Sequence, residues 1–267
     1  MSKVYEPYVI KLAHHLCEAV NQQEGVSPVV SEHPTLTVKE AYDVQLYNIN
    51  AQLADGKSIV GKKIGLTSKA MQESLGVDEP DYGHLLNDMV ISKDEPIIYA
   101  DHVLQPRVEG ELAFILKEDL IGPNVTVEEV LAATESIVAA IEIVDSRVKD
   151  WNITLRDTVA DNGSSAFYIL GETHFAPADL DRIGVKMELW KNGEFVNAGD
   201  GSAVLGDPAY CVAWLANKLH QFDIQLKKGE VILAGALSAA IPAEMGDEFE
   251  VKFTEGLGNV SIKFEER

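Results

Sequence analysis

The segment Ile137–Val144 constrains the fold more than any other part of the chain. Its sequence, IVAAIEIV, is apolar throughout except for Glu142. A continuous apolar run of this kind is typical of a β-strand buried on both faces, so we expect a sheet that is covered from both sides. A lone carboxylate in such a strand costs several kcal/mol unless it is paired, protonated or bound to a metal ion. A salt bridge to a buried lysine or arginine and a structural hydrogen bond are the alternatives to a metal site.

A second acidic feature lies on another predicted strand, Val108–Phe114. Glu109 and Glu111 are alternate residues there, and alternate residues of a strand share a face, so their Cα atoms are expected about 7 Å apart. Two like charges at this spacing repel each other unless one is protonated or a cation lies between them. Taken alone, the pair also fits a solvated strand face.

Glu142 shifts the interpretation of this pair towards a metal site. Three carboxylates without a nearby histidine or cysteine suit Mg²⁺ or Mn²⁺, both of which prefer oxygen ligands. The seven histidines show no HxH or HExxH spacing, which argues against zinc. These residues therefore favour a divalent-metal site on Glu109, Glu111 and Glu142, with the salt bridge of Glu142 still open as the alternative.

The order of the predicted elements indicates an α+β fold. Residues 1–56 have helical patterns, including a capping box formed by Thr37 and Glu40, whereas residues 57–267 are rich in strands. The predicted strands are Ile59–Leu66, Val108–Phe114, Ile137–Val144, Val185–Trp190, Val231–Ala234, Glu248–Phe253 and Val260–Phe264. Few helices separate them, which favours a small helical N-terminal region on a mixed, rolled sheet over a doubly wound parallel sheet.

Shorter signals place turns and helices between these strands. Asn192-Gly193 predicts a hairpin, Asp207-Pro208 opens a helix through about His220, and Thr126 opens a helix through about Ser136. No GxGxxG or GxxxxGK[ST] motif supports nucleotide binding.

Charge and cysteine content narrow the choice of partners and compartment. The chain has 43 acidic against 22 basic residues, a formal charge of −21, which repels nucleic acid and anionic lipid. Cys17 and Cys211 form no disulfide framework, and both are expected to be small core residues.

The sequence contains neither a signal-peptide pattern nor a run of about 18 apolar residues, so we expect a cytoplasmic protein without a membrane partner.

Three further stretches carry polar residues whose roles are open. In Gly61–Thr67, strand alternation predicts that one of Lys62 and Lys63 points inward and the other is solvated. Asp81 follows a proline in a predicted turn and has a local capping role as its common alternative. The polar segment 157–165 fits a simple loop.

Seven segments, in order along the chain, are similar to one known family. They are GKKIGLTSKAMQ (61–72), GVDEPDYGHL (76–85), PRVEGELAF (106–114), AIEIVDSR (140–147), DTVADNGSSA (157–166), LGDPAYCVAWLANKL (205–219) and ILAGALSAA (232–240). Together they resemble the 2-keto-4-pentenoate hydratases of the fumarylacetoacetate hydrolase superfamily. The resemblance extends from about residue 37 to the C-terminus, and ordered motifs are more specific than any single one.

The resemblance implies a fold, a cofactor and residue roles. The fold is a mixed β-roll at residues 57–267, the cofactor is Mg²⁺ or Mn²⁺, and the assembly is a homo-oligomer built from dimers, commonly a decamer. The metal ligands of the family match Glu109, Glu111 and Glu142. Its catalytic lysine and aspartate match Lys63 and Asp81. Ser164 and Ser238 are weaker candidates as hydrogen-bond donors to the substrate, with an ordinary turn or packing role as the alternative.

The activity implied is the hydration of 2-hydroxypenta-2,4-dienoate to 4-hydroxy-2-oxopentanoate in the meta-cleavage breakdown of aromatic compounds. The small anionic substrate would chelate the metal through its carboxylate and 2-oxygen, and a lysine near that metal is expected to have a lowered pKa.

Several alternatives share the same ligands. One is a sister enzyme, 4-oxalocrotonate decarboxylase, which often forms a complex with the hydratase, and another is a hydratase of a seven-carbon dicarboxylate. Both need a clamp for a second carboxylate, and only five arginines are present. A non-catalytic, metal-organising subunit is a third alternative, but such a subunit would have no need of both Lys63 and Asp81.

Overall fold

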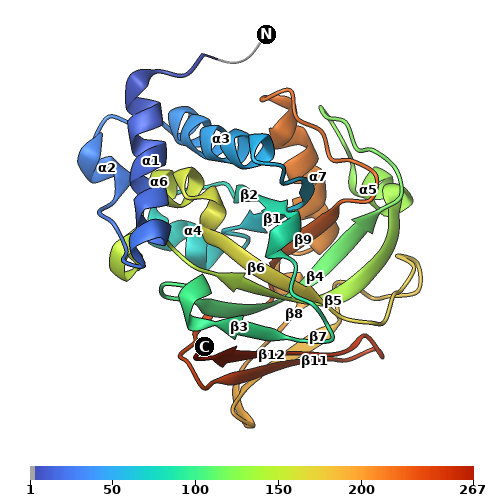
Figure 1. Ribbon diagram of the computed structural model, residues 1–267. Helices are drawn as coiled ribbons and strands as arrows, with labels where there is room; N and C mark the ends of the chain where they lie inside the picture. Colours follow the sequence, from blue (N-terminus) through green and yellow to red (C-terminus); the bar gives the residue numbers. More distant parts are fainter. Residues whose placement is uncertain (1–3) are drawn as a thin grey trace.

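Two β-sheets and a layer of helices make up the computed structural model, which describes residues 4–267 (Figure 1). The larger, seven-stranded sheet has the order β2-β1-β9-β4-β5-β6, with β10 paired to β4, and the five-stranded sheet has the order β3-β12-β11-β7-β8. Strand β1 pairs in parallel with β9, and β3 pairs in parallel with β12, whereas the other strand pairs are antiparallel. The expected α+β class with mixed sheets is confirmed.

The strands are β1 Ile59–Gly65, β2 Asp81–Leu86, β3 Ile97–Tyr99, β4 Arg107–Leu116, β5 Thr134–Val144, β6 Ser165–Leu170, β7 Lys186–Lys191, β8 Glu194–Asp200, β9 Val231–Ala236, β10 Ile241–Pro242, β11 Glu248–Phe253 and β12 Gly258–Glu265. The α-helices are α1 Pro7–Gln22, α2 Val29–Glu32, α3 Val38–Ala54, α4 Lys69–Leu75, α5 Val127–Ala133, α6 Leu155–Ala160 and α7 Pro208–His220, and a single-turn helix, η4, covers Asn162–Ser164.

The larger sheet is rolled, so that its two edge strands approach each other. Leu85 of β2 and Tyr168 of β6 belong to one small apolar cluster although four strands separate β2 from β6. The side chain of Asn162 closes the gap, because it accepts a hydrogen bond from the backbone N–H of His84 (2.8 Å) and donates one to the carbonyl of the same residue (2.9 Å). The roll gives the sheet a concave face that is shielded from solvent.

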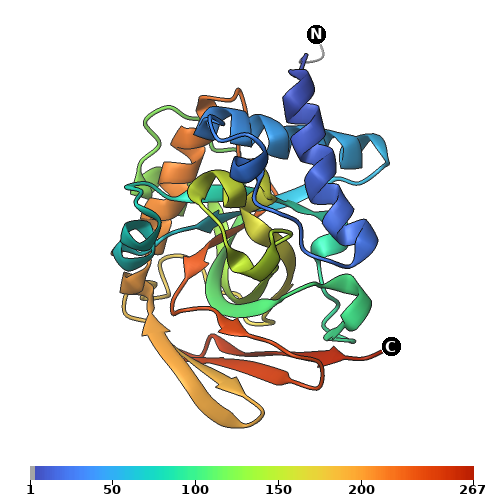
Figure 2. The same cartoon turned by 90° about the vertical axis from the view of Figure 1, so that its left-hand side faces the viewer.

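The five-stranded sheet packs against the opposite face of the roll. A Cβ atom at Gly110 of β4 would lie 2.9 Å from side-chain atoms of both Met187 and Val251, which belong to β7 and β11. The absence of a side chain at Gly110 therefore allows the close approach of the two sheets. Figures 1 and 2 show this second sheet at one end of the molecule and the N-terminal helices at the other.

Helix α3 connects the helical layer to the roll. It begins with the predicted capping box of Thr37 and Glu40, and its Gln45 donates hydrogen bonds to the carbonyls of Tyr82 and Val159 at 3.0 and 2.8 Å. One hydrophobic core extends from α1 to β12. The division into a helical region and a catalytic domain after residue 56 stays a prediction.

Several boundaries differ from those expected. The helix that begins after Thr126 ends at Ala133 instead of near Ser136, because Thr134 and Ser136 pair with Leu116 and Ile115 of β4 and extend β5. Asp81 lies at the start of β2 rather than in a turn, and the 157–165 segment contains the end of α6, all of η4 and the start of β6. The hairpin at Asn192-Gly193 and the proline-opened helix α7 are confirmed.

Two expectations about burial are wrong. Cys211 is buried as expected, but Cys17 is exposed, and its thiol lies 3.4 Å from the Asn48 side-chain oxygen of α3. Neither lysine of β1 is solvated: Lys62 is 1% exposed and Lys63 is 4% exposed, since both faces of β1 are covered. The Nζ atom of Lys62 lies 2.7 Å from both carboxylate oxygens of Glu230.

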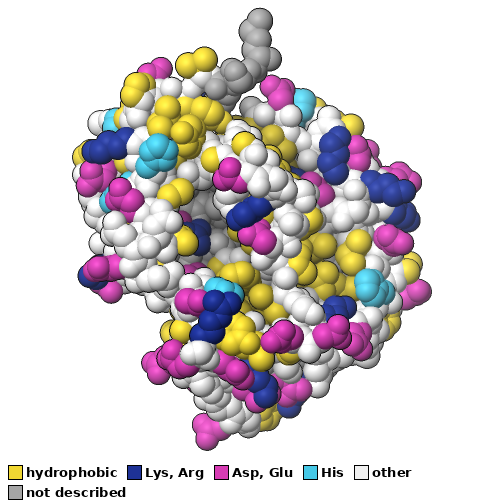
Figure 3. All heavy atoms as spheres, in the orientation of Figure 1, with side chains coloured by type: hydrophobic (Ala, Val, Ile, Leu, Met, Phe, Trp, Pro, Cys, Tyr) yellow, Lys and Arg dark blue, Asp and Glu magenta, His cyan; other side chains and the backbone are white. Residues whose placement is uncertain are grey.

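Charged residues are distributed over the surface. Acidic side chains are interspersed with lysine and arginine over the face drawn in Figure 3. Within residues 4–267, no helix has the length and apolarity needed to cross a bilayer.

The buried Lys62–Glu230 pair yields a stability prediction. Lys62→Met leaves an uncompensated buried carboxylate and should lower the free energy of unfolding by about 3–5 kcal/mol, whereas Lys62→Met combined with Glu230→Leu should restore most of the loss. Urea denaturation measures both values. A loss below about 1 kcal/mol in the single variant would show that Glu230 finds another partner or takes up a proton at little cost.

Candidate active site

The three predicted ligands lie on one face of two neighbouring strands. Glu109 and Glu111 alternate on β4, and Glu142 of β5 is directly opposite Glu109 in the antiparallel register. One carboxylate oxygen from each of the three residues lies within 4.8 Å of the others. Glu111 and Glu142 are completely buried and Glu109 is 7% exposed. Strand alternation and register therefore assemble the cluster that the sequence predicted.

Hydrogen bonds satisfy these carboxylates only in part, and the ion pair with a buried lysine that the sequence left open as an alternative is present between Lys63 and Glu142. Both oxygens of Glu142 and the Oε1 atom of Glu111 are buried without a hydrogen bond, while the Oε2 atom of Glu111 accepts one from the backbone N–H of Gly235 at 2.9 Å. Burial and the neighbouring Glu142 raise the pKa of Glu109 to about 7 and hold that of Glu111 well above its ordinary value. Buried oxygen donors that repel one another fit a divalent cation with a preference for oxygen ligands.

Lys63 and Asp81 extend the same face of the sheet. In the β1–β2 register Lys63 is opposite Gly83 and Gly65 is opposite Asp81, so both charged side chains point to the concave face. The Nζ atom of Lys63 lies 3.5 Å from a Glu142 carboxylate oxygen, and Asp81 accepts a hydrogen bond from the Thr158 hydroxyl at 3.2 Å. A Cβ atom at residue 65 would lie 2.2 Å from the Asp81 carboxylate, so only glycine leaves room for that side chain.

The electrostatics of Lys63 differ from the expectation of a lowered pKa. Burial lowers the pKa of Lys63, but the carboxylates of Glu142, Asp81, Glu109 and Glu111 raise it more, and the balance lies above the ordinary value. For Asp81, burial raises the pKa and the Lys63 ammonium opposes the rise. The expected lowering depends on a cation that neutralises the glutamates.

A cavity of about 350 Å³ opens onto this cluster. Lys63, Asp81, Glu109 and Ser164 line it, whereas Glu111 and Glu142 are buried behind its wall. Ser238 is not part of the lining, although Ala236 and Ala240 on either side of it are, and its hydroxyl is buried without a hydrogen-bond partner. The substrate roles of Ser164 and Ser238 stay predictions.

Most of the lining was not predicted as site residues, and Arg107, Trp151 and Thr158 are three of these unpredicted residues. Arg107 lies two residues before Glu109 on β4, so strand alternation already places it on the same face. Its guanidinium carbon is 4.4 Å from the centre of the Trp151 ring. Thr158 belongs to the family-like segment 157–166 and Trp151 to the stretch just before it, but no local pattern assigned either residue to the site, because both reach the cavity from outside the rolled sheet.

Comparison with known proteins agrees with this fold. Residues 55–264 match the family described as "Fumarylacetoacetate (FAA) hydrolase C-terminal". The chain therefore belongs to the fumarylacetoacetate hydrolase family.

Within that family the chain is similar to hydratases. It is 46% identical to the 2-hydroxyhexa-2,4-dienoate hydratase of Comamonas testosteroni, with 94% of this chain and 95% of the relative covered. It is 42% identical to the 2-keto-4-pentenoate hydratase of Paraburkholderia xenovorans strain LB400, with 95% and 93% covered. The solved structure of 4-oxalocrotonate decarboxylase from Pseudomonas putida G7, complexed with magnesium and adipate, superimposes with a TM-score of 0.93 at 33% identity and covers 98% of this chain and 99% of that chain.

The raised carboxylate pKa values predict how metal and pH together affect stability. The native metal-free protein retains a proton on Glu109 up to about pH 7, whereas the unfolded chain releases it near the ordinary pKa of 4.5, so stability should fall as pH rises through this interval. Saturating Mn²⁺ should remove most of that fall. At a fixed Mn²⁺ concentration a hundredfold above the Kd measured at pH 8, the stabilisation should be small at pH 5 and rise to about 3 kcal/mol at pH 8.

Thermal unfolding with Mn²⁺ or with EDTA measures the effect. Glu142→Gln should abolish the stabilisation, and Glu135→Gln, which changes an exposed residue of the same strand, should leave it intact. Equal stabilisation in both variants would argue against this metal site.

Proposed function

We propose that this chain is a hydratase that uses a divalent metal to add water to 2-hydroxypenta-2,4-dienoate (2-keto-4-pentenoate), giving 4-hydroxy-2-oxopentanoate in meta-cleavage catabolism of aromatic compounds. The observation that carries the proposal is the placement of Lys63, Asp81 and three buried glutamates on one concave face beside one cavity. Relatives that are 42–46% identical over nearly the whole chain and are named as hydratases support the substrate class.

Glu109, Glu111 and Glu142 would hold the ion, with Mg²⁺ or Mn²⁺ as the proposed choice. The bound ion would supply a positive charge that attracts the anionic substrate and stabilises enolate character at the 2-oxygen. Magnesium in the decarboxylase structure and manganese in a fumarylpyruvate hydrolase structure support this choice of ion.

Lys63 and Asp81 would carry the proton transfers. Ketonisation moves a proton from the 2-hydroxyl group to C5, and hydration then adds hydroxide from water to C4 and a proton to C3. Both steps need a base and an acid on the substrate side of the glutamates. Lys63 and Asp81 both line the cavity, and Lys63 lies next to Glu142, so each is placed to hold or move a proton there.

We also propose a homo-oligomer built from dimers, commonly a decamer in this family, a cytoplasmic location and a possible complex with a sister decarboxylase. The similarity to 4-oxalocrotonate decarboxylase supports the last of these.

A second candidate activity acts on a dicarboxylate, either by decarboxylation of 4-oxalocrotonate or by hydration of 2-oxohept-4-ene-1,7-dioate. Arg107 favours it, because a guanidinium in the cavity wall can pair with a second carboxylate. A relative named 2-oxo-hept-4-ene-1,7-dioate hydratase, from Escherichia coli, is 38% identical. Leu66, Met71, Leu75 and Ile153 form an apolar part of the same wall, which suits the uncharged end of a monocarboxylate and supports the first proposal.

The two adjacent lysines of β1 provide a matched test of the proton-transfer role. Lys63→Met should lower kcat by about 10²–10⁴-fold while Mn²⁺ still binds at least as tightly as to the wild type, because an ammonium beside Glu142 is removed. Lys62→Met removes the same charge from the opposite face and should retain near-normal kcat at a temperature where the variant is folded. Steady-state kinetics and Mn²⁺ titration measure both quantities. A Lys63→Met enzyme with unchanged kcat would remove Lys63 from the proton-transfer chemistry.

The substrate assignment is tested by separate assays with 2-hydroxypenta-2,4-dienoate, 4-oxalocrotonate and 2-oxohept-4-ene-1,7-dioate in the presence of Mg²⁺ or Mn²⁺. We expect 4-hydroxy-2-oxopentanoate from the first compound, with kcat/KM at least about tenfold above that for the dicarboxylates, which corresponds to about 1.4 kcal/mol. Release of CO₂ from 4-oxalocrotonate, with the dienoate untouched, would establish the decarboxylase instead.

A further inference from the structure

A strained turn covers the Lys63 side chain. Asn162, Gly163 and Ser164 have consecutive left-handed φ values of 56°, 63° and 52°. A non-glycine residue in this region is strained, and such strain persists only where surrounding contacts hold it. The turn lies directly against Lys63, because a Cβ atom at Gly163 would be 3.2 Å from Lys63 Cδ. Contacts that fix this turn therefore also fix one wall of the cavity.

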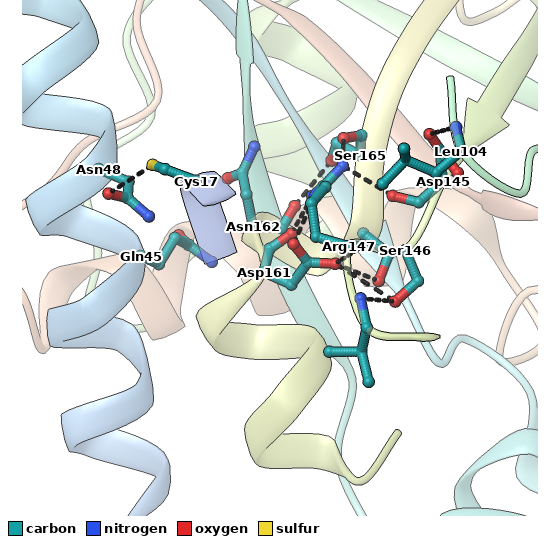
Figure 4. A network of polar contacts seen from close by, with 12 residues as sticks. Cys17, Gln45, Asn48, Leu104, Asp145, Ser146, Arg147, Asp161, Asn162 and Ser165 are labelled. Atoms are coloured by element: carbon teal, nitrogen blue, oxygen red, sulfur yellow. Dashed lines mark hydrogen bonds and ion pairs between the residues drawn. The ribbon is translucent and has the colours of Figure 1, made fainter. Parts of the chain in front are cut away.

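Arg147 makes those contacts from outside the cavity (Figure 4). Its Nε atom donates to the Asp161 carboxylate, and its Nη1 atom donates to the carbonyls of Asp145 and Ser165 at 2.7 and 2.8 Å. Its Nη2 atom donates to the carbonyl of Asp161, and its backbone N–H donates to Asp161 Oδ2 at 3.0 Å. One guanidinium thus holds both ends of the turn, and Arg147 does not line the cavity.

Asp161 connects this network to Ser164. The Ser164 hydroxyl donates to Asp161 Oδ2 at 3.2 Å, and Ser164 lines the cavity while 2% exposed. Burial raises the pKa of Asp161 to about 6 against the opposing effect of Arg147, so the carboxylate accepts hydrogen bonds at about pH 7.5. A hydroxyl has one proton to donate, and Asp161 takes it. The lone pairs of Ser164 remain available for another contact.

We propose that Arg147 and Asp161 are positioning residues that orient Ser164 as a hydrogen-bond acceptor for an O–H group of the substrate or of the adding water. The role differs from the donor role that the sequence suggested for Ser164. It adds two residues outside the cavity to those needed for efficient turnover. The proposal rests on the proposed hydratase function, since it requires a hydroxylated substrate or water in the cavity.

A second ion pair provides a matched control. Arg182 donates from Nε to Asp207 Oδ1 at 2.8 Å and from Nη2 to Asp207 Oδ2 at 2.5 Å, and both side chains are partly buried. Asp207 caps helix α7, and neither residue lines the cavity. A purely structural ion pair should therefore behave like this one when its carboxylate is replaced by an amide.

The experiment is a double-mutant cycle on the Mn²⁺-loaded enzyme with 2-hydroxypenta-2,4-dienoate as substrate. Asp161→Asn replaces an acceptor with an amide that can itself donate to Ser164, and Ser164→Ala removes the hydroxyl. Each should lower kcat/KM by about tenfold or more, the effect of one hydrogen bond to a charged group. In the double variant the loss should stay within about twofold of the larger single loss, because the two residues act through one contact.

The control and a second variant keep the outcome decisive. Asp207→Asn should keep kcat/KM within about twofold of the wild type, and its effect should multiply with that of Ser164→Ala. Arg147→Lys retains the positive charge but loses the branched set of guanidinium donors. If the Asp161→Asn variant does not fold, Arg147→Lys takes its place in the double-mutant cycle with Ser164→Ala. Mn²⁺ affinity and thermal unfolding of each variant show whether the site is assembled.

Multiplicative losses for Asp161→Asn and Ser164→Ala, or an Asp161→Asn enzyme with unchanged kcat/KM, would overturn the proposal. Absence of dienoate turnover by the wild type would instead contradict the proposed function.

Discussion

The repulsion among carboxylates buried on one face of a sheet is the constraint on which the rest of the structure depends. Glu109, Glu111, Glu142 and Asp81 surround the single ammonium of Lys63, and burial makes each unpaired negative charge costly. Solvent relieves little of the repulsion at Glu111 and Glu142, because the rolled sheet buries both side chains behind the cavity wall. The remaining sources of compensation are protonation, Lys63 and a bound cation, and these are also the elements needed to bind and protonate an anionic substrate.

The rolled sheet explains how distant sequence segments form one site. Cross-strand neighbours share a face, so the register from β2 through β1, β9 and β4 to β5 places Asp81, Lys63 and the three glutamates on the same side. The adjacent Lys62 points to the other side, where it pairs with Glu230. Two consecutive lysines thus have different roles: Lys63 lies at the site, whereas Lys62 forms a buried ion pair on the other face of β1.

The sequence was sufficient to predict that the three glutamates lie together, but not to predict which side chains surround them. Period-two alternation gives the common face of Glu109 and Glu111, and the apolar surroundings of Glu142 indicate a buried charge. The same alternation extends to Arg107 and could have identified it. Burial of both lysines depends on tertiary covering of β1, which no local pattern specifies. Thr158 and Trp151 reach the cavity through folding of segments outside the sheet, and the contacts of Arg147 depend on a turn conformation that propensities do not predict.

Gly110 lies between two of the proposed ligands, yet it faces away from them towards Met187 and Val251. The spacing between the two sheets therefore sets the position of the strand segment that carries Glu109 and Glu111. Mg²⁺ prefers oxygen ligands at about 2.0–2.1 Å, whereas Ca²⁺ accepts about 2.3–2.6 Å. A bulkier residue on the rear of β4 would collide with Met187 and Val251, so either those side chains or the strand segment would have to move. The ligand spacing of an ion held by these glutamates would thus depend partly on residues that never contact it, and laboratory evolution confined to the cavity wall would leave those residues unchanged.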